Sequence, residues 1–183
     1  MARQALSLKA RAIGLLAQRE HSRAELRRKL LRIEQQRVRL AALAATATVA
    51  QTGDGDESAG AEDGDGELGS RAEADVDALL DALASDGYLD ETRFVESRLH
   101  LRAGRFGTQR IQQELAQHGL RLDAEQQDTL RATELERAHE VWLKRFGPEP
   151  STEAGEQARQ TRFLMARGFA ADVVRRVLRR NKD

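Results

Sequence analysis

Arginine is the residue type whose number and spacing could do chemistry in this sequence, and that chemistry is the binding of anions. A guanidinium group is permanently charged and donates paired hydrogen bonds to carboxylates and phosphates. Arginines gather in three places, which we treat as candidate partner-binding residues. They are Arg23, Arg27 and Arg28; Arg98, Arg102, Arg105 and Arg110; and Arg175, Arg176, Arg179 and Arg180.

The second set has the spacing of one helix face. Arg98, Arg102 and Arg105 lie at positions i, i+4 and i+7, so a helix would present them as one basic stripe, and Arg110 follows after a glycine turn. A structural role stays open, because these arginines could instead pair with a nearby glutamate such as Glu114. The third set lies at the end of a predicted helix, where positive charge also stabilises the helix dipole.

No residue set resembles an active site. The chain has no cysteine, which excludes disulfides and thiolate chemistry. The four histidines (His21, His100, His118 and His139) share no metal-ligand spacing, and no serine beside them forms a nucleophile motif. An acidic stretch fails as a calcium loop, because Leu68 stands where the turn needs glycine. We therefore predict a protein that is not an enzyme, with no catalytic residue, cofactor or metal.

Three aromatic residues could be stacking platforms for single-stranded DNA. Phe94 and Trp142 lie on apolar helical stripes, so we expect both in the core. Tyr88, beside a glycine turn, stays open as a contact residue.

The net charge of zero conceals a strong segregation of charge along the chain. Residues 1–43 hold 11 basic against 3 acidic residues, and residues 157–183 hold 8 against 2. Residues 46–77 hold 10 acidic residues against Arg71 alone. Basic ends of this kind indicate a nucleic-acid partner or an acidic protein surface. The acidic loop could compete with that partner for the basic faces.

Helical periodicity runs through the rest of the chain, with serine or aspartate before several helices and glycine after them. Ser22 and Glu25 form a capping-box pattern. The predicted helices cover about 3–19, from Ser22 onward, 71–85, 91–104, 108–118, from Asp123 toward 131, 134–146, 151–167, and from Ala170 to the end.

These elements predict an all-α fold of three tandem three-helix repeats forming a curved, elongated array. The predicted repeats are 1–89, 90–131 and 132–183. A disordered acidic insertion at about 44–70 interrupts the first repeat, because it lacks apolar periodicity.

Three segments carry a family resemblance. The stretch from Gly87 to Leu120 resembles the middle repeat of the RecX family, regulators of the bacterial recombinase RecA. Residues 21–30 resemble the family's first repeat, and residues 162–169 resemble its last. The clearest departure is the acidic insertion.

The resemblance implies a non-enzymatic, mainly negative modulator of RecA in recombination, DNA repair and the SOS response. It would bind the groove of the RecA–DNA filament and limit filament extension, ATP hydrolysis, strand exchange and coprotease activity. We expect a cytoplasmic monomer that does not use the membrane and binds single- or double-stranded DNA weakly. The alternatives are a helix-turn-helix-like transcription regulator, with Gln109 and Arg110 at the start of its recognition helix, and a protein scaffold without DNA contact.

Overall fold

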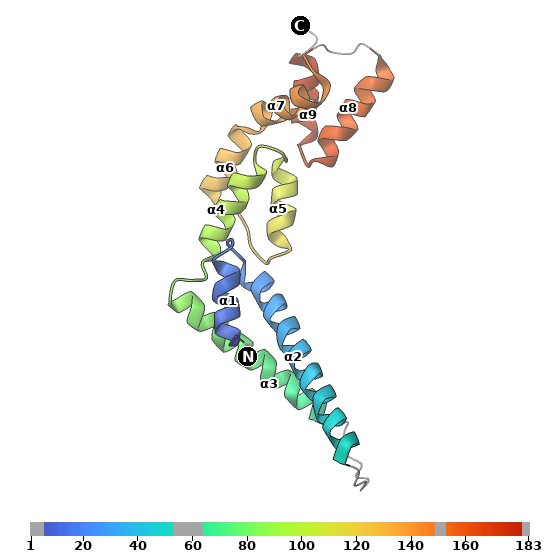
Figure 1. Cartoon of the computed structure of the whole chain (residues 1–183). Helices are drawn as coiled ribbons and strands as arrows, with labels where there is room; N and C mark the ends of the chain where they lie inside the picture. The colour runs from blue at the N-terminus through green and yellow to red at the C-terminus, as the bar shows by residue number, and fades with distance from the viewer. Residues whose placement is uncertain (1–5, 53–63, 149–152, 181–183) are drawn as a thin grey trace. The chain divides into compact units, whose positions relative to one another are not determined.

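The computed structural model describes residues 6–52, 64–148 and 153–180, which form nine helices and no strand (Figure 1). Side chains are described for all of these except residues 45–52, 64–68 and 180. The helices are α1 Leu8–Leu16, α2 Arg23–Thr52, α3 Gly64–Ser85, α4 Glu91–Arg102, α5 Thr108–Ala116, α6 Ala124–Ala132, α7 Glu134–Phe146, α8 Ala154–Ala166 and α9 Ala171–Arg180. The chain divides into two compact units, Met1–Glu91 and Thr92–Asp183.

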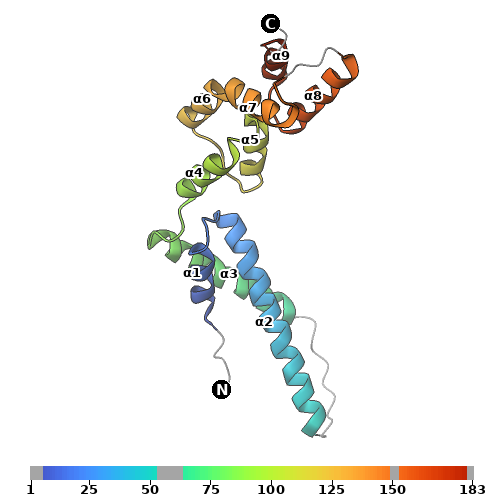
Figure 2. The same ribbon diagram turned by 45° about the horizontal axis from the view of Figure 1, so that its top comes forward.

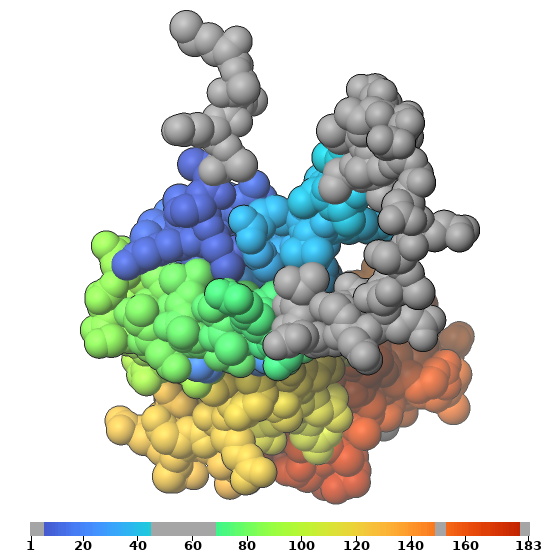
Figure 3. All heavy atoms as spheres, turned by 90° about the horizontal axis from the view of Figure 1, so that it is seen from below, coloured from blue at the N-terminus to red at the C-terminus, as the bar shows by residue number. Residues whose placement is uncertain are grey.

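In the first unit, α1 and α2 pack against α3 and share one hydrophobic core with it (Figure 3). Its core contains Ala12, Leu26, Leu30, Val76, Leu80 and Leu83, all fully buried. The predicted cap of α2 is confirmed, because the Glu25 backbone N–H donates to Ser22 Oγ at 3.1 Å. Helix α1 is shorter than the predicted 3–19, and residues 1–5 lie outside the described ranges.

The predicted limits of the acidic insertion, about 44–70, are too wide. Helix α2 continues to Thr52, and α3 begins at Gly64. The extension of α2 is rich in alanine, the best helix former, and the first turn of α3 contains acidic residues that suit a helix N-terminus. Residues 53–63 lie outside the described residues.

The second unit contains two hydrophobic clusters, each built from three consecutive helices. Helices α4–α6 enclose Phe94, Val95, Ile111, Leu115 and Leu130. Helices α7–α9 enclose Ala138, Trp142, Leu164, Phe169, Val173, Val174 and Val177, and α7 lies beside α9 in two views (Figures 1 and 2). Phe94 and Trp142 are 1% and 0% exposed, so the predicted core roles are confirmed. The three cores support a helical repeat architecture.

Three helices end in the same way, which explains the echo between repeats. Gly87, Gly119 and Gly168 have φ of 75°, 75° and 80°, a conformation that only glycine adopts without strain. The backbone N–H after each glycine donates to the leucine carbonyl five residues earlier, on Leu83, Leu115 and Leu164.

Among the described residues, no helix is both long and apolar enough to cross a membrane.

Candidate partner-binding surface

The turn between α4 and α5 presents one aromatic ring to four arginines. The guanidinium carbons of Arg102, Arg105, Arg110 and Arg167 lie 5.3, 5.9, 5.4 and 5.9 Å from the centroid of the Phe106 ring. Each such contact stabilises by about 0.5–1 kcal/mol at an exposed site. The ring therefore gathers positive charge from the consecutive segments α4, the turn and α5, and from Arg167 at the end of α8, which is far from them in the sequence.

Two glycines bring these segments together. A Cβ on Gly107 would lie 2.2 Å from the Gly168 carbonyl oxygen, and a Cβ on Gly168 would lie 2.5 Å from Arg110 Cβ. The Gly107 N–H donates to the Arg167 carbonyl at 2.9 Å, and the Gln109 N–H donates to the Gly168 carbonyl at 3.2 Å. This backbone contact joins the second and third helix triplets and places Arg167 beside the turn.

Two charged side chains of α7, the partly buried Arg137 and the buried Glu134, also hold the turn. Arg137 donates to the carbonyls of Ala103 at 2.8 Å, Phe106 at 2.9 Å and Leu130 at 2.7 Å. Burial lowers the pKa of Arg137, and nearby Glu134 opposes that shift. Glu134 is 5% exposed and accepts the Thr108 N–H at 2.9 Å. The turn is thus fixed by charge-assisted hydrogen bonds to backbone groups.

A first hollow, of about 260 Å³, lies between α4 and α5. Its basic side chains are Arg98, Arg102 and Arg110, and its one acidic side chain is Glu114. Glu114 accepts from Arg102 Nε at 3.1 Å and lies 3.7 Å from Arg110 Nε. The hollow therefore keeps a net positive charge although two of its arginines are paired.

A second hollow, of about 440 Å³, lies between the α4–α5 turn, α7 and the end of α8. It has four basic side chains and no acidic one. The Arg167 guanidinium covers the ring of Phe163 at 4.3 Å, and Arg167 Nε is buried without a hydrogen-bond partner among the described residues. Its lining residues are Gly104, Arg105, Val141, Lys144, Arg145, Phe163 and Arg167.

The predicted helical stripe needs a correction. Helix α4 ends at Arg102, so Arg105 lies in the turn and not on the helix. After Arg102 the chain turns through residues 103–107 and enters α5 at Thr108. The four predicted arginines still lie near one another. The first hollow is lined by Arg98, Arg102 and Arg110, and the second is lined by Arg105.

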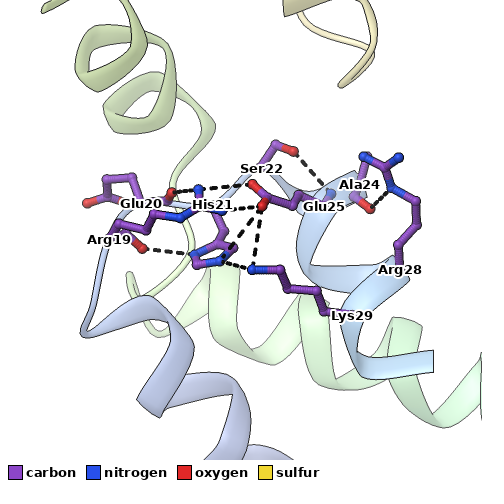
Figure 4. A network of polar contacts seen from close by, with 8 residues as sticks. All are labelled: Arg19, Glu20, His21, Ser22, Ala24, Glu25, Arg28 and Lys29. Atoms are coloured by element: carbon purple, nitrogen blue, oxygen red, sulfur yellow. Dashed lines mark hydrogen bonds and ion pairs between the residues drawn. The ribbon is translucent and has the colours of Figure 1, made fainter. Parts of the chain in front are cut away.

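The first predicted set, Arg23, Arg27 and Arg28, is largely engaged within its own unit. Arg27 donates to Asp77 at 2.7 Å and to Glu73 at 3.1 Å, and Arg23 pairs with Asp81 at 2.7 Å. The Arg27 hydrogen bond lowers the pKa of Asp77. Arg28 donates to the Ala24 carbonyl at 3.2 Å (Figure 4). Two of the three arginines thus hold α2 against α3.

The third predicted set lines neither hollow. Arg175, Arg176 and Arg179 are exposed on α9, opposite its buried valines, and the side chain of Arg180 is outside the described residues. Sequence reasoning missed Phe106, Lys144, Arg145 and Arg167. The signal for Phe106 was its place in a short turn between two glycines, with arginines on both sides.

The histidines are dispersed, and the described residues contain no cluster of three metal-ligating side chains. His118 packs on Phe94 with ring centroids 5.0 Å apart, and His139 stacks on Trp142 at 6.1 Å. Tyr88 is 48% exposed and belongs to the first unit.

Comparison with known proteins gives a consistent result along the whole chain. The family described as "RecX, third three-helix domain" matches residues 132–178. The Regulatory protein RecX of Leptothrix cholodnii is 45% identical over 179 residues, covering 97% of this chain and 90% of that protein. Its counterpart from Ralstonia pickettii is 41% identical over 178 residues, covering 96% and 89%. That of Pseudomonas putida strain GB-1 is 35% identical, covering 94% and 90%.

Proposed function

Because this chain belongs to the RecX family, we propose that it is a non-enzymatic, mainly negative modulator of RecA. It binds in the groove of the RecA–DNA filament and limits filament extension. ATP hydrolysis, strand exchange and coprotease activity fall as a consequence, since each requires the filament. The protein acts as a cytoplasmic monomer in recombination, DNA repair and the SOS response.

One observation supports this proposal beyond the family name: three of the predicted arginines, Arg102, Arg105 and Arg110, lie over the Phe106 ring. A fourth, Arg98, lines the first hollow together with Arg102 and Arg110. A filament groove offers phosphates and acidic side chains, which are the groups that guanidinium binds. A surface already held in place loses little conformational entropy on binding. We therefore assign the filament contact to the Phe106 surface, defined as Arg98, Arg102, Arg105, Phe106, Arg110 and Arg167.

The test is RecA-dependent ATP hydrolysis on single-stranded DNA, titrated with this protein below and up to equal stoichiometry. We expect inhibition well below one protein per RecA monomer, because one bound molecule stops the growth of many subunits. Changing Arg98 and Arg110 to Gln should raise the concentration needed for half-inhibition by roughly tenfold, the equivalent of about 1.4 kcal/mol. Circular dichroism would check that the double variant keeps its helices.

The matched control changes Arg121 and Arg131 to Gln, since both are exposed in the same unit and line neither hollow. The control should inhibit like the unchanged protein. Absence of inhibition by the unchanged protein at equal stoichiometry would contradict the RecA proposal. Equal effects of the two double variants would contradict the assignment of the contact to this surface.

The helix-turn-helix alternative is disfavoured by the packing of α5. A recognition helix inserts its N-terminal turn into the major groove. Here Gly107 and Thr108 are buried against the end of α8 and against Glu134. Sequence-specific binding of duplex DNA, without an effect on RecA, would revive that alternative.

A further inference from the structure

We propose that the second hollow, between the α4–α5 turn, α7 and α8, binds the phosphate backbone of a single strand of nucleic acid directly. The inference deepens the proposed function, on which it rests for its biological setting. It adds Lys144 and Arg145, which lie outside the Phe106 surface, and it requires no contact with the recombinase.

The positive charge of the second hollow is not compensated by any acidic lining residue. Lys144 and Arg145 are exposed in the last turn of α7 and form no ion pair with any described residue. Arg105 makes a ring contact with Phe106, and no carboxylate lines the hollow. Four cations around about 440 Å³ of open space raise the local concentration of anions. The hollow contrasts with the first one, where Glu114 neutralises part of the charge.

One cation of the second hollow, Arg167, is held in place before any ligand binds. Arg167 lies over Phe163 at 4.3 Å and over Phe106 at 5.9 Å, so its planar group is held by two rings. Its carbonyl is fixed as well, by the Gly107 N–H at 2.9 Å. A guanidinium held in this way loses little freedom when it binds a phosphate.

The arrangement of the cations favours a polymeric anion. Arg102 and Arg110 line the first hollow and lie over Phe106, while Arg105 and Arg167 line the second and lie over the same ring. Positive charge therefore continues from one hollow to the next, as a polymer with a charge at every unit requires.

The apolar residues that line the second hollow favour a single strand over a duplex. Val141 and Phe163 are partly exposed there beside the guanidinium of Arg167. A base can lie on apolar and guanidinium surfaces of this kind only when it is unpaired and accessible. The lining of the hollow thus offers cations for phosphate contacts and apolar surface for a base.

The experiment is fluorescence anisotropy of a labelled oligo-dT strand with the full chain, without recombinase, over a series of salt concentrations. The variant changes Arg105, Lys144 and Arg145 to Gln and leaves Arg167 in place. Its matched control changes Arg121, Arg131 and Arg162 to Gln, three exposed arginines of the same unit that line neither hollow. Circular dichroism compares their folding.

We expect the variant to bind at least about tenfold more weakly than the control, because three phosphate contacts are lost. The slope of log affinity against log salt should become shallower by roughly 0.7 for each lost contact, or about 2 in all. An affinity and a slope equal to those of the control would overturn the inference. So would a variant that loses binding of a poly-glutamate peptide but keeps oligo-dT.

The ATP-hydrolysis assay separates this inference from the proposed function. An unchanged protein that inhibits RecA but binds no oligo-dT would overturn the inference and leave the function standing. A protein that binds oligo-dT through these three residues but never inhibits RecA would support the inference and contradict the function.

Discussion

Phe106 is the residue around which the candidate surface is built, because the guanidinium groups of four arginines lie within 6 Å of its ring centroid. An arginine stacked on a ring keeps the edges of its guanidinium group available for hydrogen bonds. Four arginines share this ring. Mutual repulsion among them is reduced by Glu114, which pairs with Arg102 and Arg110. The residue pattern thus combines close packing of cations with free donor groups.

A single methyl group at Gly107 should disrupt this arrangement. Gly107 has φ of −75°, which alanine adopts readily, so the cost of Gly107→Ala comes from the clash with the Gly168 backbone. We expect the free energy of unfolding to fall by about 2 kcal/mol or more, as for overpacked sites. Urea unfolding followed by the fluorescence of Trp142, the only tryptophan, measures it.

The control for this change is Gly104→Ala in the same turn. A Cβ on Gly104 meets nothing within 4 Å, so its replacement should be close to neutral. Similar unfolding midpoints for the two variants would mean that the contact between the second and third triplets is not close.

At the scale of the helix, the start of α2 depends on a buried histidine (Figure 4). His21 is 1% exposed; its Nδ1 lies 2.9 Å from the Arg19 carbonyl and its Nε2 lies 2.9 Å from Lys29 Nζ. An ammonium group only donates, so Nε2 accepts and the ring is neutral. Burial lowers the pKa of His21, and the positive charges of Arg19 and Lys29 act in the same direction, against the Arg19 carbonyl and Glu25.

The first unit should therefore lose stability in mildly acidic solution. The unfolded chain binds a proton at His21 near its ordinary pKa of 6.5, whereas the folded unit resists protonation until lower pH. The contribution of neutral His21 to the free energy of unfolding is complete above pH 6.5 and is lost as the pH falls below 6.5. Hydrogen exchange measured by mass spectrometry, corrected for intrinsic rates, should show faster opening of the α2 start at about pH 5.5 than at about pH 7.5.

Two controls make this prediction specific. Peptides from α9, which contains no histidine, should not show the same change. His21→Gln cannot be protonated and should flatten the pH dependence at the start of α2. An unchanged exchange rate there in the original protein between the two pH values would contradict the role given to His21.

At the scale of the whole molecule, opposite charges are sorted into different parts of one neutral chain. Some of the acidic residues between positions 46 and 77 are used within the first unit, since Glu73 and Asp77 bind Arg27. Five others fall within 53–63, and they are Asp54, Asp56, Glu57, Glu62 and Asp63. Their negative charge lowers the attraction between the whole protein and any polyanion.

Neutralising these five residues to Asn or Gln should raise the affinity for oligo-dT. The net charge would change from zero to +5, since five negative charges are removed. The gain should be several-fold at low salt and small near physiological salt, where the screening length is about 8 Å. Anisotropy at both salt concentrations measures it. A gain that is equal at both would indicate an effect other than long-range charge.

The sequence by itself determined the helices, their caps and the members of the core. These features depend on neighbours within a few residues. Ser22 caps the start of α2 by accepting the Glu25 N–H, and Gly119 follows the end of α5. Apolar residues recur with the helical period and form the core. It also indicated that arginines near the α4–α5 turn could form a binding surface. The predicted limits of the acidic insertion, about 44–70, were wrong because the high helix propensity of alanine extends α2 to Thr52.

Only the tertiary structure decided which arginines are available. Arg27 and Arg98 look alike in sequence, but α3 brings Asp77 and Glu73 to Arg27, whereas Arg98 lies over Phe94 at the edge of a hollow. Arg167 joins Arg105 because Gly107 and Gly168 allow two backbones to touch, and Lys144 and Arg145 join them because Arg137 and Glu134 hold α7 against the same turn. Such contacts join residues some 60 positions apart, and no local pattern of residue types specifies them.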